Sequence, residues 1–97
     1  MTFPIQITFH GMDRSDSLDA KIRERLDKVE RICPRVTGCR VVVEAPHKVH
    51  LSIRLPRTLL SVSKGEQKNG EHLDLPLVVR QAFDAVERAL REFNTQN

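Results

Sequence analysis

Four basic residues spaced three or four positions apart are the sequence's best candidates for functional chemistry: Lys21, Arg25, Lys28 and Arg31. On a helix this spacing places the charged groups about one turn apart along one flank, where they can follow the phosphates of a nucleic-acid backbone. Arg25 falls within the apolar stripe of the same helix, so its stem should pack while its guanidinium reaches past the edge. The pattern favours non-covalent binding of a polyanion.

No cluster of residues predicts catalysis or metal binding. The histidines are scattered along the chain: His10, His47, His50 and His72. Cys33 and Cys39 have five residues between them, which fits neither a zinc knuckle nor a redox motif, so buried or half-buried free thiols are expected. The sequence contains no nucleophile elbow and no glycine-rich phosphate loop. We therefore expect no enzymatic activity, no cofactor and no metal.

The bulk properties predict one small domain over residues 1–97. A chain of 97 residues with 39% hydrophobic and 30% charged residues is typical of a globular domain. Its net charge of +3 permits nucleic-acid binding without requiring it. No apolar run approaches the ~18 residues of a membrane span, and the first residues do not form a signal peptide. We expect a cytoplasmic protein.

The elements that must position the basic residues follow from periodicity. Alternating apolar and polar residues predict strands over residues 3–10, 39–44, 49–55 and 60–63, and helical spacing predicts helices over Asp16–Ile32 and 74–93. Ser15 or Asp16 caps the first helix, Pro34 stops it, and Asp74 caps the second. Residues 64–72 are expected to form a mobile surface loop, with the glycine at 65 simply flexible, and residues 94–97 a frayed tail.

This order predicts an α+β fold with β-α-β-β-β-α topology. A right-handed crossover makes the first two strands parallel neighbours, and the other strands follow as an antiparallel meander. Because only one face of each strand is apolar, both helices should lie on that face. The opposite face should then present these side chains to solvent: Gln6, Thr8, Arg40, Val42, Glu44, His50, Ser52, Arg54, Ser61 and Ser63.

The second predicted helix has opposite charges four residues apart, which is typical of surface ion pairs. The pairs are Arg80–Asp84, Asp84–Arg88 and Glu87–Arg91, each contributing about 0.3–0.5 kcal/mol. The chain has no Trp or Tyr, and its four Phe residues occupy core positions, so no platform for stacking bases is predicted. Any contact with RNA should therefore be to its backbone and shape.

Four stretches together resemble the ribosome hibernation promoting factor family, also called ribosome-associated inhibitor A or ribosomal subunit interface proteins. Residues 22–31 resemble the Arg-Leu-x-Lys-Leu-Glu-Lys pattern of the family's first helix, residues 74–90 its second helix, and residues 5–11 and 40–44 two of its strands. The similarity covers almost the whole chain. Ala85 stands where the family usually has Lys, and Pro76 where it usually has Tyr.

The resemblance implies a four-stranded sheet with two helices on one face, similar to double-stranded RNA-binding domains. It implies a non-enzymatic protein that docks on the small ribosomal subunit and its RNA, blocks the channel of messenger and transfer RNA, and inhibits translation in the idle ribosomes of stress and stationary phase. Arg25, Lys28 and Arg31 fall on basic positions of the family's first helix, Arg88 on one of the second helix, and Arg91 more loosely. The sequence as given has neither the basic tail nor the dimerising domain of long forms, so the short form is expected.

Two other hypotheses remain open from the sequence. The topology also suits a general double-stranded RNA-binding module with no connection to ribosomes. The weak net charge and the exposed last strand suit a protein-interaction module, which would regulate transcription or assemble by strand pairing at that edge.

Overall fold

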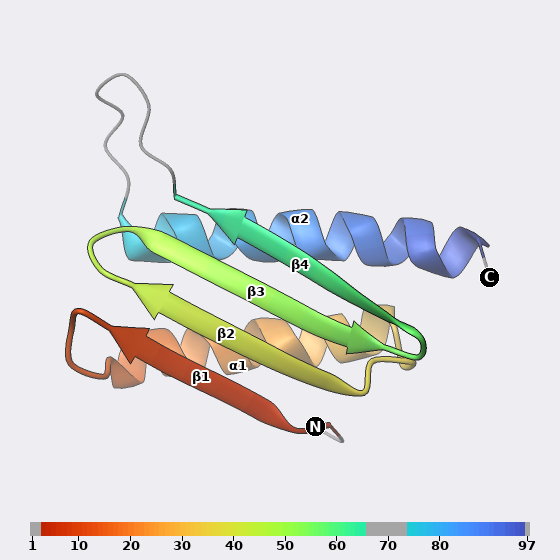
Figure 1. The fold of residues 1–97 in the computed structure, drawn as a ribbon, viewed down its shortest axis with the longest axis horizontal. Helices are drawn as coiled ribbons and strands as arrows, with labels where there is room; N and C mark the ends of the chain where they lie inside the picture. The colour runs from red at the N-terminus through yellow and green to blue at the C-terminus, as the bar shows by residue number, and fades with distance from the viewer. Residues whose placement is uncertain (1–2, 66–73, 97) are drawn as a thin grey trace.

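The computed structural model describes residues 3–65 and 74–96, and its element order confirms the predicted α+β topology. The sheet contains β1 (Ile5–His10), β2 (Gly38–Glu44), β3 (Lys48–Leu55) and β4 (Thr58–Lys64), in that spatial order. Helix α1 (Asp16–Ile32) connects β1 to β2, and α2 (Leu75–Gln96) follows β4. β1 and β2 pair in parallel and the remaining neighbours pair antiparallel, as the crossover rule predicts (Figure 1).

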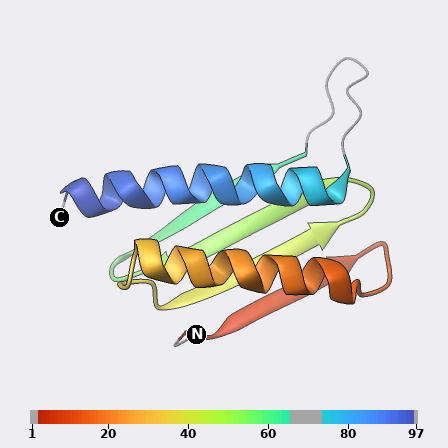
Figure 2. The ribbon, with the colours of Figure 1, turned by 180° about the vertical axis from the view of Figure 1, so that it is seen from behind.

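The molecule has two layers, with both helices on one side of the sheet (Figure 2). Alternation explains this arrangement, because Val41, Val43, Leu51 and Ile53 point to the same face and are fully buried. The helices cover that face with Ile22, Leu26, Phe83 and other apolar side chains. The opposite face of the sheet has no covering layer among the described residues, as the sequence predicts.

The helix ends follow partly from the predicted caps. Ser15 accepts a hydrogen bond from the Leu18 amide at 3.2 Å, and Asp74 accepts one from the Leu77 amide at 2.9 Å. The prediction of a frayed tail from residue 94 is wrong, since α2 continues to Gln96. The Asn94 amide donates a hydrogen bond of 2.6 Å to the Ile32 carbonyl, which ties the last turn of α2 to the end of α1.

The predicted loop over 64–72 lies outside the described residues except for its first two positions. Lys64 is the last residue of β4 and Gly65 is buried, with φ +105°. A Cβ at Gly65 would overlap the carbonyl oxygen of His47, so this glycine permits a close approach of two backbone segments. The prediction that Gly65 is merely flexible is therefore wrong.

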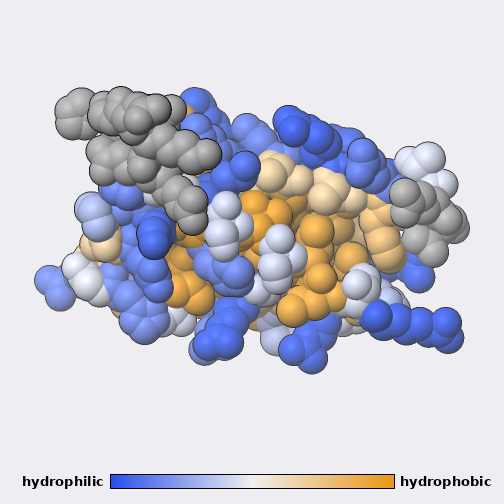
Figure 3. Space-filling view, turned by 45° about the horizontal axis from the view of Figure 1, so that its top comes forward, coloured by the Kyte–Doolittle hydropathy of each residue, from blue (hydrophilic) through white to orange (hydrophobic). Residues whose placement is uncertain are grey.

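The edge formed by β4 and α2 has an apolar centre with hydrophilic side chains around it (Figure 3). β4 is an edge strand, and its half-buried Leu60 and Val62 pack against the core under α2. Leu59, on the other face of the strand, is 56% exposed.

No described helix is long and apolar enough to cross a membrane.

Candidate nucleic-acid interface

The predicted basic residues belong to α1 and α2, which run side by side on one face of the sheet (Figure 2). The two helices point in the same direction, because Leu18 near the start of α1 lines a pocket with Pro76 and Val79, while Ile32 at its end contacts Asn94. Cations on the inner flank of α1 therefore face the side chains of α2. This geometry decides which of them are available to a ligand.

Arg25 is held by carboxylates of α2. Its Nε and Nη2 donate hydrogen bonds to one oxygen of Glu87 at 3.1 and 2.7 Å, and Nη2 also donates to Asp84 at 2.8 Å. Its guanidinium carbon lies 5.5 Å from the centre of the Phe83 ring. Burial alone would lower the pKa of Arg25, but the hydrogen bonds and charges of Glu87 and Asp84 outweigh burial and raise the pKa.

Lys28 shares the same carboxylate. Its Nζ lies 3.2 Å from the second oxygen of Glu87, whose side chain is only 4% exposed. Glu87 is thus a nearly buried anion between two cations of the other helix. The predicted row of cations along α1 is therefore not free for a ligand at Arg25 and Lys28, because Asp84 and Glu87 of α2 pair with them. The expected packing of the Arg25 stem is confirmed, since its side chain is 24% exposed.

The other four predicted residues have different surroundings. Lys21, Arg31, Arg88 and Arg91 are exposed. None of the four forms an ion pair with a described residue. The prediction of ion pairs within α2 is wrong, because Asp84 and Glu87 pair with Arg25 of α1 and not with the arginines four residues away in their own helix.

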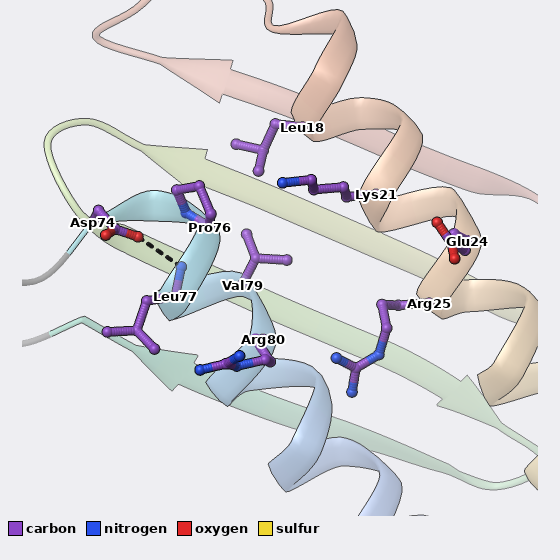
Figure 4. Close-up of a pocket in the computed structure, with 9 residues that line it drawn as sticks. All are labelled: Leu18, Lys21, Glu24, Arg25, Asp74, Pro76, Leu77, Val79 and Arg80. Atoms are coloured by element: carbon purple, nitrogen blue, oxygen red, sulfur yellow. Dashed lines mark hydrogen bonds between the residues drawn. The ribbon is translucent and has the colours of Figure 1, made fainter.

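An open pocket of about 510 Å³ lies between the N-terminal halves of the two helices (Figure 4). Leu18, Pro76 and Val79 supply apolar lining, while Lys21 and Arg25 approach from α1 and Arg80 from α2. Glu24 and Asp74 lie at the same pocket. Arg80 is a cation that the charge spacing paired with Asp84. Its distance of eleven residues from Arg91, about three helical turns, indicates that these two arginines share one helix face.

A second hollow, of about 550 Å³, lies along the later half of the pair. It brings together three predicted residues, Lys28, Arg88 and Arg91, with the acidic Asp84, Glu87 and Glu92. Across both hollows, six cationic and five acidic side chains line the two-helix face. This face therefore offers a few separate cations to a polyanion, and its net charge is small.

The described residues contain no group of three or more His, Cys, Asp or Glu side chains placed to hold a metal ion. Both cysteines are buried free thiols, as predicted. Burial raises the pKa of the Cys39 thiol to about 12. His50 lies on the open sheet face, with Nδ1 2.6 Å from Ser63 Oγ and Nε2 3.2 Å from Ser52 Oγ.

Comparisons with known proteins agree with this architecture. A ribosomal subunit interface protein from Coxiella burnetii has a similar structure, with TM-score 0.80 and 17% identity, covering 96% of this chain and 99% of that chain. The N-terminal domain of Thermus thermophilus Protein Y matches with TM-score 0.76 and 18% identity, covering 94% and 99%. No curated protein matches the sequence. The family model described as sigma 54 modulation protein / S30EA ribosomal protein matches residues 5–97, so the chain belongs to this family.

Proposed function

We propose that this protein binds the ribosome in the cytoplasm, docks on the small subunit and inhibits translation by occupying the channel of messenger and transfer RNA. It acts by binding and catalyses no reaction. The observation that carries the proposal is the family match over residues 5–97, whose description names a ribosomal protein. The Coxiella burnetii neighbour, described as a ribosomal subunit interface protein, supports the same partner.

The surface supplies groups suited to RNA. Lys21 and Arg31 on α1 and Arg88 and Arg91 on α2 extend into solvent, and cations of this kind contact phosphate oxygens without reading sequence. If about four of them neutralise phosphates, affinity should fall about 100-fold between about 50 and 200 mM salt. Arg25 and Lys28 would contribute only where RNA phosphates compete with Glu87.

The primary test is sedimentation with purified vacant ribosomes and with separated subunits in a density gradient. We expect co-migration with the small subunit at low salt and release as salt rises. Protein that stays at the top of the gradient at low salt would refute ribosome binding. A cell-free translation assay tests the second half of the proposal: bound protein that leaves translation unchanged would refute the blocked channel.

Charge removal tests the two-helix face. Arg88→Gln together with Arg91→Gln should weaken binding about tenfold and reduce the salt slope by about two. Lys48→Gln together with Lys64→Gln is the matched control, because it removes the same charge from exposed side chains at the far end of the sheet. Equal losses in both variants would mean that net charge, and not this face, determines binding.

The affinity for free double-stranded RNA distinguishes ribosome binding from the alternative function, a general double-stranded RNA-binding module. A general duplex-binding module should bind a short RNA duplex as tightly as it binds the ribosome. We expect much weaker duplex binding, because a short free duplex can contact only the few separate cations of the two-helix face, which acidic residues surround. Equal affinities would favour the general module.

A further inference from the structure

The uncovered face of the sheet has a charge pattern unlike that of the helices. Its outward positions on β2 and β3 are fixed by the register, in which Gly38 lies opposite Arg54 and Arg40 opposite Ser52. Arg40 and Arg54 are therefore diagonal neighbours on one face, with Cα atoms about 7–8 Å apart. Both side chains are exposed.

No described carboxylate balances these two guanidinium groups. Neither Arg40 nor Arg54 takes part in an ion pair with a described residue. Glu44 is the one acidic outward residue on the four strands, and it lies opposite Lys48 at the other end of β2. Two unpaired like charges side by side repel each other, and an anion placed between them would relieve that repulsion.

The two arginines also line a hollow of about 440 Å³. Gly38 leaves room there, since a Cβ at this position would meet nothing closer than 3.8 Å. Gln6 and Ser52 add side-chain hydrogen-bond donors to the same hollow. Leu59, opposite Arg54 on β4, provides an exposed apolar surface at its margin.

We propose that this hollow is a second RNA-binding site, in which Arg40 and Arg54 hold successive phosphates of one backbone segment while Leu59 supports the sugar or base beside them. The inference rests on the proposed function, since it assigns a further contact to the same ribosomal RNA. Guanidinium groups bind phosphate through paired N–H donors, and uncharged donors such as Gln and Ser add phosphate contacts in RNA interfaces. The helices and the sheet face then contact two different RNA segments.

The test compares Arg40→Gln/Arg54→Gln with the control Lys48→Gln/Lys64→Gln, both measured for ribosome affinity across a salt series. We expect the arginine variant to bind about tenfold more weakly and to lose about two units of salt slope, with a smaller effect of the control. Equal affinities and slopes in the two variants would overturn the second site while the proposed function stood. Absence of ribosome binding by the wild-type protein would overturn the proposed function and the second site with it.

Two further variants separate charge from shape and RNA from protein. Gly38→Glu and Gly38→Gln place side chains of equal size in the hollow, so weaker binding of the Glu variant alone supports an anionic ligand, and equal binding opposes it. A photo-crosslinking residue introduced as Leu59→benzoylphenylalanine identifies the neighbour directly. Crosslinks to ribosomal RNA support the inference, and crosslinks only to a ribosomal protein overturn it.

Discussion

Glu87 is the residue on which the helix pair depends most strongly for its electrostatics. Its nearly buried carboxylate accepts hydrogen bonds from Arg25 and lies within ion-pair distance of Lys28. Burying this anion is favourable only because two cations accompany it, so removal of its charge leaves Arg25 with Asp84 alone. The same carboxylate competes with any phosphate for both cations.

Glu87→Gln should therefore separate stability from binding. We expect the free energy of unfolding to fall by about 1–3 kcal/mol, measured by urea denaturation, because Arg25 loses its charged partner Glu87 and retains only Asp84. Ribosome affinity should rise, because Lys28 becomes free to meet a phosphate. Glu92→Gln is the matched control, as it makes the same charge change at an exposed position of α2. Equal stability of the two variants would show that the buried carboxylate contributes little.

The sequence could predict part of this arrangement. Arg25 lies in the apolar stripe of its helix, and this position correctly indicated a packed stem. Its partners could not be predicted, because Asp84 and Glu87 lie 59 and 62 residues away and their approach depends on how the two helices rotate against each other. Charge spacing within α2 favoured local pairs, but tertiary contact outweighed these weak interactions.

Cys39 makes stability depend on pH. Its pKa rises from 9.0 to about 12 on burial, so above pH 9 the unfolded chain loses the thiol proton while the folded protein retains it. The free energy of unfolding should be unaffected by this group below pH 9 and should fall by up to about 1.4 kcal/mol per pH unit above it. Thermal melts from pH 8 to 11 measure this effect. Cys39→Ala should flatten the dependence, and an unchanged slope would contradict it.

At the scale of elements, alternation and helical spacing predicted all four strands and both helices because each has one buried side. The end of α2 was missed because Asn94 and Thr95 are polar and belong to no apolar stripe. Both are nevertheless held by hydrogen bonds, Asn94 to the Ile32 carbonyl and Thr95 to the Arg91 carbonyl at 2.8 Å. The tertiary contact of Asn94 is polar, so it leaves no periodic signal in a sequence.

Asn94→Ala should loosen the junction between the two helix ends. The Ile32 carbonyl would lose its side-chain donor, and we expect stability to fall by about 0.5–1.5 kcal/mol, with faster amide exchange in the last turns of both α1 and α2. Thr95→Ala is the control, since its hydroxyl bonds only within α2. Exchange in α1 should be unchanged in that variant. Equal exchange in α1 for both variants would show that Asn94 does not link the helices.

At the scale of the whole molecule, positive charge is distributed over two opposite faces. The two-helix face mixes cations with nearly as many acids, whereas the open sheet face has Arg40, Lys48 and Arg54 against Glu44 alone. The Cα atoms extend over 19 Å along the shortest axis, so one flat ligand surface cannot contact both faces. Net charge alone, at +3, conceals this asymmetry.

Two modes of binding follow from this distribution, and they differ in how mutations combine. If both faces contact RNA at once, the losses from Arg88→Gln/Arg91→Gln and from Arg40→Gln/Arg54→Gln should add within about 0.5 kcal/mol, because distant sites contribute independently. If the protein binds in either of two orientations, using one face at a time, each pair alone should cost little and the fourfold variant should lose binding almost completely. Ribosome affinities of the wild type, both double variants and the fourfold variant complete the cycle. We expect additivity, because each of the two faces is proposed to contact its own RNA segment. A loss in the fourfold variant far above the sum of the two separate losses would contradict simultaneous contact.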